Sequence, residues 1–241
     1  MVLCKIFVNS SVLSPVISSA IMGIVTESAA HGADMCRAEG KRGVHMTVTE
    51  EIQALKKEKN AVILAHYYVR PEGQEIADYT GDSFYLSKIA TGLEEQTIVF
   101  CGVSFMGESA KILNPEKTVL MPDARADCAM AHMADEECPK AVLDLADYVG
   151  STSGIIRYAR ESGGDEFIIC TENGVRAALE KENPEKRFYF TETEPVCEDM
   201  KRITLEKIRH VLKTGDNEVR MDARLMEEAK APLTEMLRLG D

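Results

Sequence analysis

Two cysteines, Cys128 and Cys197, lie 69 positions apart at matched places in an internal repeat. Sliding the chain by this offset aligns two stretches without a gap; the identities include Ala-Asp-Tyr at 77–79 and 146–148, Asn-Pro-Glu-Lys at 114–117 and 183–186, and Cys101 with Cys170. If the repeats pack about a pseudo-axis, the sulfurs of Cys128 and Cys197 approach each other near that axis. Thiolates that converge in this way suit an iron–sulfur cluster or zinc.

The remaining cysteines supply few further ligands for such a site. Cys101 and Cys170 each end an apolar run, and free cysteine is among the most buried residue types, so we expect core thiols there. Two thiolates are too few for a cluster, since even a site with one open iron needs three. The third would have to come from Cys138, which has no counterpart in the first repeat, or from a second chain.

A second group of polar residues follows a buried strand. Residues 61–65 (Ala-Val-Ile-Leu-Ala) form an apolar run of the kind buried in a parallel sheet, and His66 and two tyrosines come directly after it. Open α/β sheets place ligands at the carboxyl ends of their strands. His66 therefore has two interpretations. It donates to a substrate oxygen or phosphate, or it is a strand-end histidine whose hydrogen bonds are satisfied within the fold.

Strands and helices alternate through both repeats. We expect further strands at 97–101, 119–121, 166–170 and 187–190, separated by helices. This order predicts an α/β fold of repeated three-layer α/β/α units with short parallel sheets. Two helices end the chain, one from Thr204 to position 213 and one over 222–239, and we expect them to pack on the last unit.

The composition is that of an ordinary globular protein. The 241 residues are 45% hydrophobic and carry a formal net charge of −12, which argues against nucleic-acid binding because that function usually needs a basic face. No apolar run is long enough to span a bilayer without interruption, so we expect no membrane partner. Residues 26–45 show neither helical nor strand period, and residues 1–45 are expected to be an unassigned, disordered leader or to precede the true start at Met46. A signal peptide is the alternative for the mildly apolar residues 2–25.

Motifs in both repeats resemble the quinolinate synthase family. Those of the first repeat resemble its first domain: HYY at 66–68, GDS at 81–83, CGVSFMGESA at 101–110, NPEK at 114–117, and Cys128. Those of the second repeat resemble its last domain: from ECP at 137–139 to GSTSG at 150–154, then VC at 196–197 and MKRITLE at 200–206.

The resemblance implies three similar domains about a pseudo-threefold axis, of which this chain has the first (46–134) and the last (135–241). Each domain of the family gives one cysteine to a 4Fe-4S cluster, whose open iron binds substrate as a Lewis acid. The implied reaction is the condensation of iminoaspartate with dihydroxyacetone phosphate to quinolinate in NAD biosynthesis, with loss of phosphate and water. A reducing, cytoplasmic location and L-aspartate oxidase as an upstream partner follow from the same resemblance.

The resemblance also assigns cluster ligands and catalytic groups. Cys128 and Cys197 would ligate the cluster. Tyr68 would assist proton transfer and Glu137 would be the acid/base residue, the simpler interpretation of Glu137 being a solvated loop carboxylate.

Substrate binding is implied for four residues. They are His66, Ser83, Ser151 and Thr152. The last three lie where helices begin, and their hydroxyls with the free backbone N–H groups there would hold a carboxylate or phosphate. Ser83 is alternatively a helix N-cap.

The chain departs from the family near positions 131–136. The middle domain, which would bring another cluster cysteine, is absent, and Asp135 stands where the family has a substrate-binding histidine. An acidic group there repels a dicarboxylate. The alternative function is therefore a truncated, non-catalytic remnant that folds, or forms a homodimer over the faces left by the missing domain, without a complete cluster. A zinc-dependent lyase or hydrolase is a weaker alternative because histidines are few.

Overall fold

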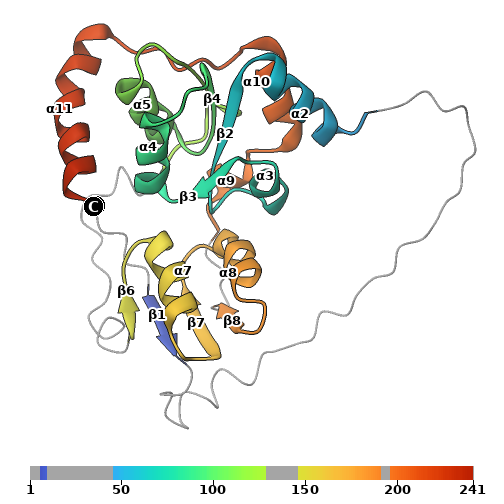
Figure 1. Ribbon diagram of the computed structural model, residues 1–241, viewed down its shortest axis with the longest axis vertical. Helices are drawn as coiled ribbons and strands as arrows, with labels where there is room; N and C mark the ends of the chain where they lie inside the picture. The colour runs from blue at the N-terminus through green and yellow to red at the C-terminus, as the bar shows by residue number, and fades with distance from the viewer. Residues whose placement is uncertain (1–5, 10–45, 129–145, 191–195, 241) are drawn as a thin grey trace, which may run out of the picture.

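A four-stranded parallel sheet forms the centre of the first of two α/β units in the computed structural model, which describes residues 6–9, 46–128, 146–190 and 196–240 (Figure 1). Its strands run in the order β3-β2-β4-β5, namely β3 (Tyr79–Gly81), β2 (Ala61–His66), β4 (Thr97–Cys101) and β5 (Thr118–Leu120). β2 is buried along its whole length, as expected of a strand covered on both faces. The strands predicted for this repeat are confirmed.

Helices cover both faces of this sheet. α4 (Ser83–Thr91) and α5 (Ser104–Leu113) pack together on one face, and α2 (Val48–Glu58) lies on the other, while the short α3 (Pro71–Glu75) follows β2 (Figure 1). α2 begins with a capping box, in which the Thr47 hydroxyl accepts from the Glu50 N–H and the Glu50 carboxylate accepts from the Thr47 N–H. This pairing satisfies N–H groups that the first turn of α2 would otherwise leave without partners.

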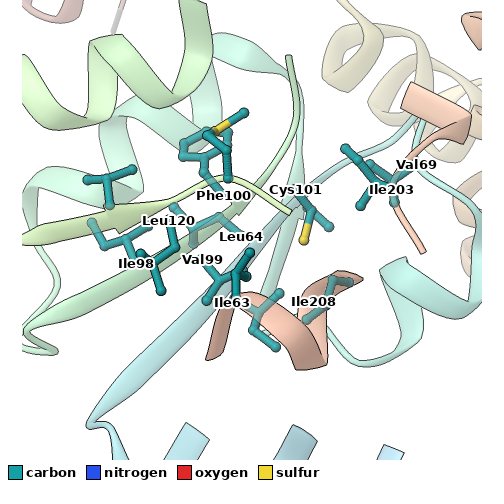
Figure 2. Close-up of a cluster of buried hydrophobic side chains, with 14 of the residues drawn as sticks. Ile63, Leu64, Val69, Ile98, Val99, Phe100, Cys101, Leu120, Ile203 and Ile208 are labelled. Atoms are coloured by element: carbon teal, nitrogen blue, oxygen red, sulfur yellow. The ribbon is translucent and has the colours of Figure 1, made fainter. Parts of the chain in front are cut away.

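The core of the first unit is mostly aliphatic and is shared with the end of the chain. Figure 2 shows side chains from neighbouring strands packed together with two residues from beyond position 200: Ile63, Leu64, Ile98, Val99, Phe100, Leu120, Ile203 and Ile208. All of these are at most 3% exposed. The last two show that the C-terminal segment closes this core.

The C-terminal helices pack on the first unit, and the expectation that they pack on the last unit is wrong. α10 (Leu205–Thr214) lies against α2 and β4, and α11 (Ala223–Leu239) lies against α5 and α4, whereas the short α9 (Glu198–Lys201) leads into them. The reason is that β2 and β4 are apolar on both faces, so the face beside α2 needs a second helix, and α10 buries Ile208, Val211 and Leu212 there.

The second unit is a four-stranded sheet whose helices lie on one face in the described part of the chain. Its strands include β6 (Tyr148–Val149), β7 (Glu166–Cys170) and β8 (Arg187–Phe190), and its helices are α7 (Thr152–Glu161), the 3₁₀ turn η4 (Asn173–Val175) and α8 (Arg176–Glu182). Phe167, Ile169 and Phe188 are buried with the helices, whereas Ile168 and Tyr189 on the other face are partly or well exposed. Buried and more exposed side chains therefore alternate along β7 and β8, as expected of a sheet that is covered on one face.

The fourth strand of this sheet comes from the leader. β1 (Ile6–Asn9) lies between β6 and β7 and pairs with both in the antiparallel sense, giving the order β6-β1-β7-β8. This is an exception to the expectation that residues 1–45 have no place in either unit. No helix in the described ranges is long and apolar enough to cross a membrane.

Candidate functional site at the junction of the units

The carboxyl end of β2 meets the second unit, and Tyr68 is one of the residues that join the two units. Its hydroxyl lies 3.3 Å from Thr152 Oγ1, at the start of α7, and 3.0 Å from Thr171 Oγ1, just past the end of β7. The junction therefore unites the ends of strands from both repeats, where α/β folds bind ligands.

Burial extends the pH range over which Tyr68 stays protonated. It raises the pKa of the phenol from 10.0 to about 12, while the hydrogen bonds with Thr152 and Thr171 act in the opposite direction. Tyr68 is a neutral phenol at physiological pH, as an ordinary tyrosine also is.

His66 is fixed beside Tyr68 by the backbone. Its Nδ1 accepts from the Tyr68 N–H at 3.1 Å, and the two rings meet edge to face with centroids 4.4 Å apart. Because Nδ1 accepts, the neutral ring carries its proton on Nε2, which makes that nitrogen the donor. The side chain is 4% exposed, so the sequence-predicted position at the end of a buried strand is confirmed. Its substrate role stays a prediction.

Asp82 links the two helices that begin at this junction. One carboxylate oxygen caps α4 by accepting from the Tyr85 N–H at 3.0 Å, and the other accepts from the Ser153 N–H of α7 at 3.1 Å. The N-cap of α4 is thus Asp82, and Ser83 is the first residue of the helix, half-buried. Sequence reasoning did not single out Asp82, although an aspartate before a helix is a strong capping signal.

Ser151 and Thr152 have different positions despite being adjacent. Ser151 is exposed and is the N-cap of α7, with its hydroxyl accepting from the Gly154 N–H at 3.1 Å. Thr152 is fully buried and faces Tyr68. The structure therefore brings Thr152 together with Tyr68, and leaves Ser151 at the surface of the same helix start.

A buried ion pair that the sequence reasoning missed crosses the junction. Lys201 Nζ lies 2.9 Å from Glu172 Oε1 and donates to the Tyr68 carbonyl at 2.7 Å. Glu172 also accepts from the Cys197 N–H at 3.2 Å and from the Gly174 N–H at 2.6 Å. Thr171 and Glu172 follow β7 as His66 ends β2, so the strand-end rule could have found them. The repeat comparison hid them because positions 102 and 103 are Gly and Val.

Close backbone contact seals the junction at Gly174. A Cβ atom there would lie 2.6 Å from the Tyr67 carbonyl oxygen and 2.7 Å from Tyr68 Cα, so only glycine fits. Gln74 bridges the two segments by donating to the Tyr67 carbonyl at 2.8 Å and to the Gly174 carbonyl at 3.2 Å.

Cys128 and Cys197 pack against the same hydrophobic core. Burial raises the pKa of the Cys197 thiol, the N–H groups of Met200 and Asp199 lower it, and the charges of Glu172 and Cys128 raise it further. Cys197 adjoins the junction because its N–H donates to Glu172. The convergence of the two sulfurs stays a prediction.

The donor set for a metal or cluster is incomplete in the described ranges. No group of three or more histidine, cysteine, aspartate or glutamate side chains that could hold a metal is found there. Two thiols do not fit a 4Fe-4S cluster, which is held by cysteine thiolates at three or four irons. Glu137 and Cys138 lie outside the described residues.

Cys101 and Cys170, the other two cysteines matched by the repeat, differ in burial. Cys101 is fully buried and burial raises the pKa of its thiol, as expected of a core residue. Cys170 is only partly buried, because it lies at the end of β7 in the sheet whose helices cover one face.

Known proteins resemble both parts of this chain. The family model described as NadA, quinolinate synthetase A protein, matches residues 50–137 and 133–238. Three relatives named quinolinate synthase come from Clostridioides difficile (strain 630), Fusobacterium nucleatum subsp. nucleatum and Clostridium perfringens (strain 13 / Type A). They are 36%, 34% and 34% identical over 299, 296 and 300 residues, which cover 80%, 79% and 81% of this chain and 98%, 99% and 100% of the relatives.

These alignments are longer than the part of this chain that they cover. Eighty per cent of 241 residues is about 193, so about 106 of the 299 positions aligned with the Clostridioides difficile protein have no residue from this chain. Two family matches that meet at 133–137 are consistent with one internal stretch of the relatives being absent there.

Proposed function

Since the chain belongs to the quinolinate synthetase A family, we propose that it acts in NAD biosynthesis by condensing iminoaspartate with dihydroxyacetone phosphate to quinolinate. The observation that supports this most is the meeting of Tyr68, Thr152 and Thr171 between the two units, beside His66. A buried hydroxyl network at strand ends, flanked by helix starts, suits small anionic substrates.

The proposed substrate contacts come from both units. His66 donates from Nε2 to a substrate oxygen, and Ser83, Ser151 and Thr152 bind carboxylate or phosphate oxygens with their hydroxyls and the N–H groups of the helix starts. Lys201 offsets the charge of Glu172 next to this region, so the buried carboxylate does not repel an anion by itself.

Proton transfer is assigned to Tyr68 and Glu137. Tyr68 is protonated at neutral pH and is proposed to donate this proton to an oxygen that gains charge. Glu137 is proposed as the acid/base residue on the resemblance alone, since it lies outside the described residues.

Cys128 and Cys197 are proposed as two ligands of a 4Fe-4S cluster, with the third thiolate from Cys138 or from a second chain. No step proposed above depends on the cluster, because two thiols do not complete its ligand set. The other partners proposed are a second copy of the chain as a homodimer and L-aspartate oxidase as the source of iminoaspartate, in the cytoplasm.

A second candidate function is a non-catalytic family remnant. Two observations favour it: the incomplete set of thiols in the described ranges, and the roughly 106 aligned positions of a relative that this chain lacks. Such a protein would fold and associate but make no quinolinate.

Anaerobic reconstitution with iron and sulfide tests the proposal. We expect about four iron and four sulfide per chain or per dimer, and quinolinate from iminoaspartate and dihydroxyacetone phosphate. Cys128→Ala and Cys197→Ala should each abolish both, while Cys170→Ala, the matched control, should leave both unchanged. Protein that binds no iron, or that binds a cluster and makes no quinolinate, leaves the remnant as the function.

A further inference from the structure

The second strand position of each sheet is occupied by a strand from a different part of the chain. In the first unit, β2 lies between β3 and β4; in the second, β1 lies between β6 and β7. β6 and β7 are the repeat counterparts of β3 and β4, because the offset of 69 carries Tyr79 onto Tyr148 and Thr97–Cys101 onto Glu166–Cys170. β1 thus stands where the repeat requires a counterpart of β2.

The register of the two central strands is the same. Leu64 pairs with Tyr79 and Phe100, and Phe7 pairs with Tyr148 and Ile169, which are the positions 69 further on. One step along, Ala65 pairs with Thr80 and Cys101, and Ile6 pairs with Val149 and Cys170. Only the strand direction differs, since β2 is parallel and β1 antiparallel to its neighbours.

The sequence explains why residues from the N-terminal segment take the strand position between β6 and β7. At the offset, the counterpart of Ala61–His66 is 130–135, which reads Met-Ala-His-Met-Ala-Asp and has no β-branched or large aromatic residue. Residues 6–8 are Ile-Phe-Val, which are strong strand formers. Two facing rows of unpaired N–H and C=O groups on β6 and β7 would otherwise remain, and an incoming strand satisfies both rows.

We infer that β6 and β7 form a strand-acceptor slot and that Ile6–Asn9 of the same chain is its occupant, acting as a positioning strand for the junction. Only two residues separate the end of β6 from Thr152, the first residue of α7, and β7 ends at the residue before Thr171. β6 and β7 are not neighbours in the sheet, so β1 is the strand that joins them. Its loss separates the two threonines that meet at the Tyr68 hydroxyl. This inference is independent of any quinolinate synthase activity.

Phe7→Pro tests the slot, because proline removes a backbone donor and cannot occupy a central strand. Hydrogen exchange of the full-length protein should show the β7 amides that face β1 exchanging about tenfold faster or more, with the β2 and β4 amides as an internal reference that does not change. Ser11→Pro, two positions beyond the strand, is the matched control and should leave β7 unchanged. A peptide of residues 2–12 added to the Phe7→Pro variant should restore β7 protection, and a scrambled peptide should not.

Three results would overturn the inference. One is unchanged β7 exchange in Phe7→Pro, and another is equal rescue by the scrambled peptide. The third is a wild-type dimer, detected by light scattering, whose β7 protection comes from residues 6–9 of the other copy, because the occupant would then be the partner's strand.

Discussion

At the scale of single residues, Tyr68 is one of the groups that make stability depend on alkaline pH. Its pKa rises from 10.0 in the unfolded reference to about 12 in the fold, chiefly through burial. The native state therefore holds this proton more tightly than the unfolded state between these values, and the free energy of unfolding falls as the pH rises above about 10. In Tyr68→Phe this fall should be smaller, which urea unfolding at pH 8 to 11 measures.

Tyr68→Phe should also lower stability at pH 8, by about 1 kcal/mol, because Thr152 and Thr171 lose a hydrogen-bond partner. Tyr189→Phe is the control, since Tyr189 is 39% exposed in β8. If both variants show the same alkaline slope, the Tyr68 phenol is not held neutral by burial.

Asp123 contributes to the dependence of stability on pH in acid. Burial alone raises the pKa of this carboxyl, but hydrogen bonds from Arg125 and Lys207 outweigh it and hold the pKa well below its usual range. The stabilisation is therefore present above the ordinary value of 3.8 and is lost as the pH falls through and below it. Asp123→Asn should lose about 1–3 kcal/mol at pH 7 and show a shallower decline in acid than the wild type.

The control for Asp123 is Asp216→Asn, which removes an exposed carboxylate paired with His210. Its effect on the free energy of unfolding at pH 7 should be within about 1 kcal/mol. An Asp123→Asn variant with the acid slope of the wild type would show that other carboxyls drive acid unfolding.

The sequence predicted which residues lie at the ends of strands only where a local pattern shows where the strand or the following helix begins or ends. His66, Tyr68 and Thr152 were found because an apolar run or a Gly-Ser start precedes them. Lys201 and Glu172 were missed because they form a pair across 29 positions, and nothing local in either segment indicates a partner. Cys128 and Cys197 were singled out because a repeat indicates long-range proximity, which single motifs do not, and their convergence stays a prediction.

At the scale of elements, α10 is the part whose placement was predicted wrongly from the sequence. Its apolar stripe predicts a packed helix, but it carries no information on which sheet it covers. The strands and their alternation with helices were predictable because the sheet of the first unit buries continuous apolar runs. β1 was not, because a four-residue strand in a segment without a clear period is defined only by its neighbours.

Replacing one α10 side chain tests that the C-terminal segment stabilises the first unit. Ile208 is fully buried against the sheet, so Ile208→Ala should cost about 2–5 kcal/mol through the lost methyl groups and the cavity left behind. The matched control is Leu225→Ala in α11, where the side chain is 51% exposed and the change should be within about 0.5 kcal/mol.

Urea unfolding monitored by far-UV circular dichroism gives both numbers. Hydrogen exchange then shows where the loss falls: the amides of β2 and β4 should lose protection in Ile208→Ala. Exchange that changes only in the second unit would contradict the packing of α10 on β4.

At the scale of the whole molecule, the two units have separate hydrophobic cores and are joined largely by polar contacts. Hydrogen bonds from Tyr68, Gln74 and Asp82 and the Lys201–Glu172 ion pair cross the junction, and the Tyr67 side chain packs against the core of the second unit. Buried charges that lose a partner are costly, so this junction should decide whether the units unfold together.

Lys201→Met removes the cation and leaves Glu172 as an unpaired carboxylate whose side chain is 7% exposed. We expect a loss of about 3–5 kcal/mol and, because the junction fails first, two calorimetric transitions in place of one. The double variant Lys201→Met/Glu172→Gln should recover part of the loss, since glutamine carries no charge and still accepts from the Gly174 and Cys197 N–H groups.

The control is Arg187→Met, which breaks the exposed ion pair with Glu166. It should leave a single transition because that pair lies within the second sheet and is solvated. A single transition in Lys201→Met, or no recovery in the double variant, would mean that the ion pair does not couple the two units, and the contacts of Tyr68 and Asp82 with α7 would then be the links that couple them.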